Sequence, residues 1–487
     1  MRRKLAAALI TLTAIAAAGG KFRDPAPPAV ANLPSAPGPA PEKNEDVTFR
    51  ARPKPLPAGA VTHDWTSFLG PTHNAMSTET RLLQSFPKTG PKLVWEMKKG
   101  TSYSSPAISG DRLLFIHRVG SEERVECLRR ETGERYWRFT YPTRFEDRYG
   151  YNNGPRASPV IDGDRVYTYG AEGKLHCLKL ETGQVYWKRD LRGEFKIPQD
   201  FFGVASTPLI EGDLLIVNIG APGGPSVAAF DKKSGAMVWG AGSQWGASYA
   251  SPVPATVNGK RRIFVLAGGE SRPPTGGLMS IDPQNGAVDF EFPWRSKSYE
   301  SVNAACPLIV GNQVFISASY KTGGALLNLL PNGGQSVAWT TDNLATHFNT
   351  AVHKDGYLYG FDGRNEPDAS LVCLELKTGK LMWRVNPEWE ESLTINGAEH
   401  RQTLGTFRGT LLWVDGKFLC LGELGHLLWL ELTPKGYKQL SRAWLFAARE
   451  TWALPVLSKG LLYVTQNTKD IMRGDGPRLL CYDLRGE

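Results

Sequence analysis

The sequence predicts an all-β protein, namely an eight-bladed β-propeller whose blades are four-stranded antiparallel sheets. Three observations lead to this prediction. A Gly–Trp motif recurs along the chain, a Ser-Pro motif precedes it in each repeat, and one Trp-containing strand stands alone before the first repeat. Four short strands in each unit of about 50 residues are typical of a propeller blade.

The first motif is a Gly followed four residues later by Trp. Between these motifs lie alternating segments such as 165–169 and 174–180, which read as half-buried strands. We expect the aromatic side chains of this register to dock one blade against the next, because aromatic residues dominate core burial. These blade-docking residues are Trp95, Trp137, Trp187, Trp239, Phe290, Trp339 and Trp383.

The second motif is a small residue, often followed by Pro, and then a turn such as Gly110-Asp111 or Gly163-Asp164, whose residues accept positive φ readily. It occurs eight times, which predicts eight blades. The copies begin at Ser105, Ser158, Thr207, Ser251, Cys306, Thr350, Thr410 and Leu454.

The last repeat, from Leu454 to the end, runs out before a Trp strand, whereas the strand around Trp95 has no repeat of its own. We therefore expect the N-terminal strand to complete the last blade. Such an exchange closes the ring and hides sheet edges that would otherwise be exposed.

Residues 1–18 have the features of a secretory signal peptide: a cationic start at Arg2-Arg3-Lys4, an apolar run and small residues at its end. Residues 19–62 are rich in Pro and Ala and are expected to form a disordered linker, which leaves 63–487 for the propeller. No Cys follows the apolar run, so no lipid anchor is indicated. The expected location is the periplasm or the extracellular space.

The net charge of +9 does not point to nucleic acid. Residues 1–62 carry nine Lys and Arg against four Asp and Glu, so most of the excess charge lies in the N-terminal segment. The remaining chain has no evident basic stripe, and no apolar run after the leader is long enough to span a membrane. We expect a monomer that does not bind nucleic acid and does not span a membrane.

The Thr-Gly-x-x-x-Trp motif with its preceding Ser-Pro strand resembles the pyrroloquinoline-quinone (PQQ) repeat propellers, which include BamB-like envelope proteins and quinoprotein dehydrogenases. The resemblance covers residues 64–487. The start at Asp64-Trp65 is similar to that of secreted bacterial members, although Leu69 stands where an Arg is usual. The repeat is specific for the fold and poorly specific for function.

The resemblance to quinoprotein dehydrogenases implies PQQ as a cofactor, but the sequence does not support it. Those enzymes have an adjacent Cys-Cys pair and calcium ligands, and this chain has no adjacent cysteines. The six cysteines fall on predicted strands, three of them (Cys127, Cys177, Cys373) six residues before the repeat Gly, so we expect unpaired core fillers. No spacing predicts a metal site, and no catalytic residue is assigned.

The residues just before each Ser-Pro motif are expected to border the central channel and form a polar funnel. Two long loops, 145–155 and 388–406, add to it, and the second contains His400 beside Glu399. The bland interpretation is a water-filled mouth, and the functional one is a binding site for a small polar ligand or a peptide. The candidate ligand-binding residues are Tyr103, Arg156, Tyr249, Asn303, His347, Asn349, His400, Arg408 and Glu450.

Two functions fit the sequence. The one it favours is a non-catalytic module that binds a protein, a peptide or cell-envelope material. The alternative is a quinoprotein-like oxidoreductase, or another enzyme with its site in the funnel. The absent Cys-Cys pair and the compact repeats favour the first.

Overall fold

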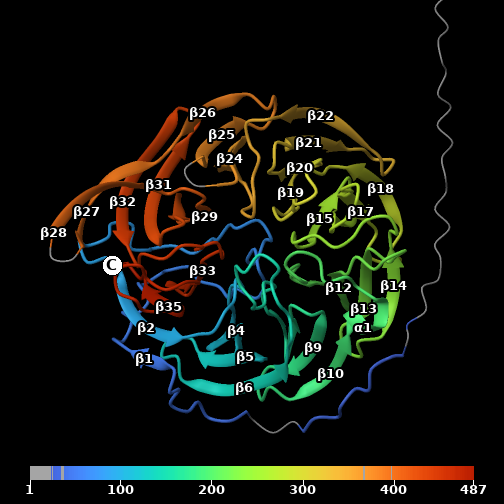
Figure 1. The fold of residues 1–487 in the computed structure, drawn as a ribbon, viewed down its shortest axis with the longest axis horizontal. Coiled ribbons are helices and arrows are strands. Elements are labelled where there is room, and N and C mark those ends of the chain that lie inside the picture. The colour runs from blue at the N-terminus through green and yellow to red at the C-terminus, as the bar shows by residue number, and fades with distance from the viewer. Residues whose placement is uncertain (1–23, 25, 35–37, 366–367, 396–397, 487) are drawn as a thin grey trace, which may run out of the picture.

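The computed structural model describes residues 24, 26–34, 38–365, 368–395 and 398–486 as a ring of eight four-stranded antiparallel blades (Figure 1). The predicted fold class is thereby confirmed. Helix is confined, in these residues, to the five-residue α1 (Leu191–Phe195).

Each blade runs from a short inner strand to an outer strand. Blades 1 to 4 comprise β3 (Ala107–Ser109), β4 (Arg112–Val119), β5 (Glu122–Arg129) and β6 (Arg135–Pro142); β7 (Val160–Asp162), β8 (Arg165–Tyr169), β9 (Lys174–Lys179) and β10 (Val185–Asp190); β11 (Leu209–Glu211), β12 (Leu214–Asn218), β13 (Val227–Asp231) and β14 (Met237–Ala241); and β15 (Val253–Val257), β16 (Lys260–Ala267), β17 (Gly277–Ile281) and β18 (Val288–Pro293).

Blades 5 to 7 comprise β19 (Leu308–Val310), β20 (Gln313–Ala318), β21 (Gly323–Leu329) and β22 (Gln335–Thr341); β23 (Val352–Lys354), β24 (Tyr357–Asp362), β25 (Ser370–Glu375) and β26 (Leu381–Val385); and β29 (Thr410–Val414), β30 (Lys417–Leu421), β31 (His426–Thr433) and β32 (Gly436–Trp444). A separate hairpin, β27 (Glu388–Ile395) with β28 (Ala398–Gly405), joins blades 6 and 7.

Blade 8 closes the ring as predicted. Its inner strands β33 (Val456–Ser458), β34 (Leu461–Gln466) and β35 (Arg478–Asp483) come from the end of the chain, and β2 (Lys92–Lys98) comes from the beginning. Trp95 of β2 lies opposite Cys481 of β35, so the expected strand exchange is confirmed.

The repeat motif contains both Trp and Gly because the Trp ring of one blade packs directly on the Gly of the next, where a side chain would clash. A Cβ placed on Gly183 would lie 2.5 Å from the Trp137 ring, and one on Gly235 would lie 2.7 Å from the Trp187 ring. The Trp137 indole N–H also donates to the Leu180 carbonyl of the next blade at 2.9 Å. The same indole-to-carbonyl bond is made by Trp95, Trp187, Trp239, Trp339 and Trp383.

The small residue of the Ser-Pro motif forms a second set of links between blades. The backbone N–H of Ser105 donates to the Ser158 hydroxyl at 3.0 Å, and the N–H of Ser158 donates to Thr207 in turn. The series continues through Ser251, Cys306 and Thr350. The side chain at this position accepts a hydrogen bond from the neighbouring blade and must also fit beside the inner strand. A small polar residue meets both requirements.

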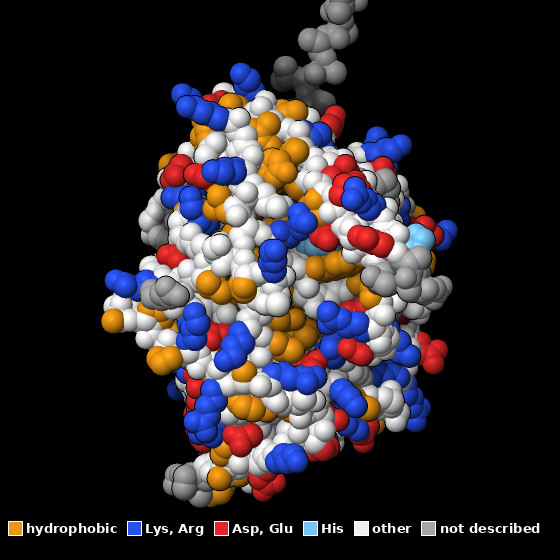
Figure 2. Space-filling model, turned by 90° about the vertical axis from the view of Figure 1, so that its left-hand side faces the viewer, with side chains coloured by type: hydrophobic (Ala, Val, Ile, Leu, Met, Phe, Trp, Pro, Cys, Tyr) orange, Lys and Arg blue, Asp and Glu red, His pale blue; other side chains and the backbone are white. Residues whose placement is uncertain are grey.

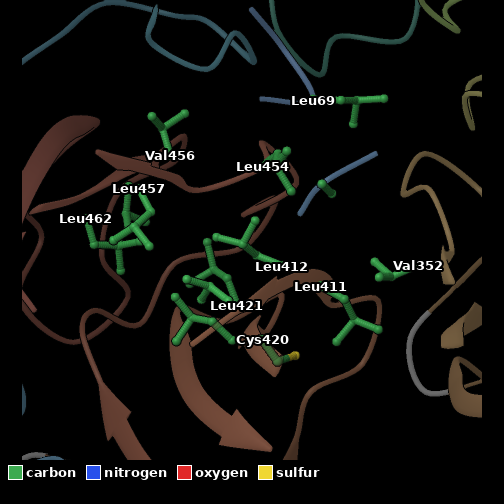
Figure 3. Close-up of a cluster of buried hydrophobic side chains, with 14 of the residues drawn as sticks. Leu69, Val352, Leu411, Leu412, Cys420, Leu421, Leu454, Val456, Leu457 and Leu462 are labelled. Atoms are coloured by element: carbon green, nitrogen blue, oxygen red, sulfur yellow. The ribbon is translucent and has the colours of Figure 1, made fainter. Parts of the chain in front are cut away.

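The apolar core lies within and between the blades. Figure 3 shows part of it, where Leu411, Leu412, Cys420 and Leu421 of blade 7 lie near Leu454 to Leu462 of blade 8. All six cysteines are buried and free, which confirms the prediction of unpaired core fillers.

The described part of residues 19–62 is not a disordered linker, and that expectation is wrong. Residues 24, 26–34 and 38–62, which we call the strap, lie along the outer strands of blades 3, 2, 1 and 8 (Figure 1, blue). The Ala31 N–H donates to Tyr186 O at 2.8 Å, and β1 (Val47–Phe49) pairs with β2. Outer strands expose unpaired backbone groups, so even a Pro-rich segment with little to bury gains hydrogen bonds there.

Residues 65–82 cross the face of the ring that carries the turns after the inner strands. Trp65 bridges to Ile108 of blade 1, and Met76 bridges to Trp413 of blade 7. Between them, Leu69 and His73 border a cavity of about 150 Å³ against the inner strands of blades 2 and 3 and the start of blade 4. We call the opposite face, which carries the connections between successive blades, the loop face. The signal peptide predicted at 1–18 lies outside the described residues.

Candidate functional site

The loop face collects the connections between successive blades, and most of the predicted funnel residues meet there. Tyr103 comes from the connection between blades 8 and 1, Arg156 from that between blades 1 and 2, and Glu450 from that between blades 7 and 8. The Tyr103 hydroxyl donates to a Glu450 carboxylate oxygen, and the Arg156 guanidinium lies 5.3 Å from the Tyr103 ring centre. The structure thus brings these three residues together at one end of the channel.

Arg156 is not a free positive charge. Its Nη2 donates to Asp147 Oδ2 at 2.7 Å and to Asn152 O at 3.1 Å, and Nη1 donates to Gly154 O at 3.2 Å. The Asp147 carboxylate also accepts the backbone N–H groups of residues 149 and 152. This buried pair therefore shapes the loop of residues 143–159 and leaves Arg156 little capacity for a ligand.

Arg408 is held in the same way by a second buried carboxylate. Its Nε donates to Glu423 Oε2 at 2.9 Å, and its Nη1 donates to Arg364 O at 2.7 Å. The Trp452 indole N–H donates to the other oxygen of Glu423 at 2.7 Å. Both cations predicted for the funnel are thus paired within the protein.

Burial shifts the pKa values of three other titratable groups of the mouth. Burial raises the pKa of Glu450 above its ordinary value and outweighs the opposing effect of its hydrogen bond from Tyr103. Burial, aided by nearby Glu270, raises the pKa of Asp200 to about 6. Burial also lowers the pKa of His347 to about 3, with Arg408 and Arg364 adding to the effect, so this imidazole is neutral and pairs with the Tyr320 hydroxyl at 3.1 Å.

Aromatic rings fill the centre of the mouth. Tyr151 lies 6.0 Å from the Trp452 ring on one side and 6.2 Å from Phe202 on the other. Trp452 also contacts Tyr103 and Phe348, each at 5.2 Å. Because these five rings come from five different connections between blades, they bridge the mouth rather than line one wall.

Two of these rings are open to solvent. Tyr149 is 45% exposed and Tyr151 is 52% exposed, although both belong to a loop fixed by buried Asp147. Tyr149 packs beside Phe201 and Phe202, each at 5.7 Å. The result is an exposed aromatic surface at this end of the channel.

The remaining predicted site residues serve the scaffold or lie elsewhere. The Asn303 amide donates to Ala267 O and Trp294 O, the Asn349 amide donates to Gly409 O, and the Tyr249 hydroxyl accepts the Phe202 N–H at 3.1 Å. His400 is exposed on β28, opposite Leu393, and the β27–β28 hairpin lies outside the ring beside blade 7 (Figure 1).

The long loop expected over 388–406 is therefore a hairpin on the rim and not part of the funnel. Its Trp389 ring lies 4.8 Å from His426, and Glu391 pairs with Arg442 at 2.9 Å, so it packs on the outer strands of blade 7. Apolar residues at Trp389, Leu393 and Ile395, an alternation interrupted only by Glu391, could have indicated the strand.

Sequence reasoning missed Asp147, Glu423 and Phe202 as members of the mouth. None of them stands at a repeat position, so no periodic signal marks them.

Among the described residues, no group of three His, Cys, Asp or Glu side chains is placed to hold a metal ion. In that same part of the chain, no helix is long and apolar enough to cross a membrane.

A family model described as "Outer membrane protein assembly factor BamB" matches residues 121–385, a little over half of the chain. The chain belongs to this PQQ-repeat family. The match begins in blade 1 and ends in blade 6, so it rests on the repeats described above. A search of curated proteins found no match.

Solved structures of two kinds share the family's fold with this chain. BamB from Moraxella catarrhalis is 16% identical with a TM-score of 0.53, over 81% of this chain and 99% of that one. A quinohemoprotein alcohol dehydrogenase from Comamonas testosteroni is 13% identical with a TM-score of 0.60, over 87% and 81%. A europium-containing methanol dehydrogenase is 11% identical with a TM-score of 0.55, over 83% and 89%. At these identities the likeness concerns the fold alone.

Proposed function

We propose that the protein is an exported, non-catalytic binding module that recognises another protein, a peptide or cell-envelope material through its loop face. The observation that carries the proposal is the exposed aromatic surface of Tyr149 and Tyr151 on the loop face. Arg156 and Arg408 of the same face are already neutralised by carboxylates of the protein. Tyrosine supplies large contact area at little conformational cost and is enriched where proteins bind one another.

The same residues do not fit PQQ, the cofactor that the family resemblance raises. A planar tricarboxylate needs an open slot and unpaired cations, whereas Arg156 and Arg408, the two arginines predicted for the mouth, bind Asp147 and Glu423. The rings of Tyr151, Phe202 and Trp452 occupy its centre. The description of the matching family as an outer-membrane assembly factor supports a protein or envelope partner.

The proposal is tested by placing a photo-crosslinking amino acid at position 151 and, as a matched control, at Val337, which is similarly exposed on the outer strand of blade 5. Crosslinking in intact producing cells should give one discrete adduct from position 151 that is lost with Tyr149→Ser, and none from 337. Equal adducts from both positions would contradict a specific loop-face site.

The enzyme alternative has its own measurement. Purified protein incubated with PQQ and calcium is desalted, and bound quinone is measured by visible absorption and mass analysis. We expect no stoichiometric retention. A one-to-one complex that is lost with Trp452→Ala would favour the oxidoreductase instead.

A further inference from the structure

The junction between blades 7 and 8 differs from the other junctions at the position of the repeat Trp. Ser441 of β32 stands there, opposite Trp429 and just before the strand bulge, as Trp137 stands opposite Cys127 in blade 1. The Ser441 hydroxyl accepts the Phe86 N–H at 2.7 Å, and the Trp429 indole N–H donates to Leu83 O at 2.9 Å. Residues 83–93 of the N-terminal segment therefore take the place of the missing aromatic ring.

This replacement leaves a groove of about 760 Å³ at the rim, which we call the seam groove. One wall is the face of β35 that carries Arg478, Leu480 and Tyr482, which alternate along the strand and so point the same way. The other wall consists of Trp444 with Phe86 and its neighbours. Figure 2 views the molecule from this side and shows Lys and Arg side chains gathered around apolar ones.

The seam groove is strongly cationic. Its lining includes Lys54, Lys92, Arg473, Arg478 and Arg485, but a single carboxylate, that of Asp483. That carboxylate is occupied, since it accepts the backbone N–H of Lys54 at 2.6 Å and that of Arg485 at 3.0 Å. Arg478 and Arg485 are paired with the carboxylates of Glu96 and Glu131, at 2.7 Å each. The positive charge that remains for an anion therefore comes mainly from Lys54, Lys92 and Arg473.

Arg478 adds a directional donor. It is only 8% exposed. Its Nη1 donates to Glu96 at 2.7 Å and to Asp475 at 3.2 Å, and its Nε donates to Gln466 at 2.8 Å. Its Nη2 is buried without a hydrogen-bond partner among the described residues. An unsatisfied buried donor costs free energy, so an acceptor oxygen that reached it would be stabilised.

We propose that the seam groove binds a small organic anion whose carboxylate or phosphate group accepts from Arg478 Nη2 and whose apolar body packs against Phe86 and Trp444. Carboxylate and phosphate groups are equivalent for this purpose, because the oxygens of both accept charge-assisted hydrogen bonds. The site lies on the rim between blades 7 and 8, so it is separate from the loop face and stands whether or not that face binds a partner.

A second groove of similar volume provides a matched control. It measures about 690 Å³ and is lined by residues of 142–144, 172–174 and 190–197. Its four cations (Arg144, Lys174, Arg192, Lys196) are balanced in part by Glu172 and Asp190, and its lining contains no aromatic side chain. It offers positive charge without the donor or the apolar wall of the seam groove.

The test is calorimetric titration of the full chain at low ionic strength with phenyl phosphate, phenylacetate, inorganic phosphate and benzyl alcohol. Arg473→Glu reverses an exposed charge of the seam groove, and Lys196→Glu does the same in the control groove. We expect at least one aromatic anion to bind, and Arg473→Glu to weaken it roughly tenfold or more. Lys196→Glu should leave the affinity unchanged, benzyl alcohol should not bind, and inorganic phosphate should bind more weakly than phenyl phosphate.

The relative affinity of the two aromatic anions tells which oxyanion the site prefers. The proposal is overturned if neither binds, or if Lys196→Glu weakens binding as much as Arg473→Glu does. Equal binding of inorganic phosphate and phenyl phosphate would overturn the role given to Phe86 and Trp444. Melting temperatures of both variants within error of the parent chain ensure that a loss of binding is not a loss of folding.

Discussion

A single hydrogen atom on each repeat glycine determines how closely two blades approach. Gly183 has φ +73° and lies under the Trp137 ring, whereas Gly163, in the turn of the same blade, has φ +56° and nothing within 4 Å of an added Cβ. Both positions strain a residue with a side chain, but only the first also creates a clash.

We therefore expect Gly183→Ala to lower the free energy of unfolding by about 1–3 kcal/mol more than Gly163→Ala, because overpacking adds to the shared backbone cost. Chemical denaturation of the two variants measures the difference. In a Trp137→Ala background the excess should disappear, since the clashing ring is gone. An excess that persists there would show that the ring is not its cause.

Arg156 is expected to contribute to stability rather than to ligand affinity. Arg156→Ala leaves the buried Asp147 carboxylate without its cation, and breaking such a pair costs about 3–5 kcal/mol. The double variant Arg156→Ala with Asp147→Asn should be less destabilised than the single one. Thermal and urea unfolding would settle the matter, and a single variant as stable as the parent chain would refute the role of this pair in holding the loop.

His176 gives the protein a pH dependence whose sign can be worked out. Burial, with Lys188 and Lys174 adding to it, lowers its pKa to about 3 in the folded state, whereas the unfolded chain has the ordinary value of 6.5. Between these values the unfolded state binds more protons, so stability falls as the pH falls from 6.5 towards 3.

His176→Phe removes the titrating group and keeps a ring beside Phe139 and Tyr141. Relative to the parent chain, this variant should gain about 2 kcal/mol between pH 7.5 and pH 5. Unfolding curves at the two pH values give that difference. A constant difference between the two proteins would contradict the low pKa of the buried imidazole.

At the scale of elements, the repeated features and the closing strand β2 could be predicted, whereas the strap and the charge pairs of the mouth could not. The blades, the turns and the Trp-docking register all recur, so each copy supports the others. The strap was missed because its Pro-rich composition has little to bury, yet it is held by backbone bonds such as that from Ala31. The charge pairs of the mouth were missed because Asp147 and Glu423 occupy positions that no other blade repeats.

The strap and the closing strand β2 should differ in what they contribute. Deleting residues 24–62 removes edge contacts and leaves the ring closed. Cooperative unfolding should therefore persist with a lower melting temperature, by about 1 °C per kcal/mol lost for a domain of this size. Deleting residues 24–98 also removes β2, exposes the edge of β35 and should abolish the cooperative transition. Calorimetry of the two truncated chains tests this, and equal melting temperatures would refute the closure by β2.

For the whole molecule, the docking of Trp95 sets an order of events while the chain is being made. Its indole contacts Gly133 and donates to Arg130 O, both in blade 1, whereas its backbone pairs with β35, which is synthesised last. The nascent chain can therefore hold β2 on the first blade long before the partner strand exists. Until residues 478–483 have been synthesised, the edge of β2 that pairs with β35 has unpaired backbone groups. The growing protein is most prone to misassembly in this interval.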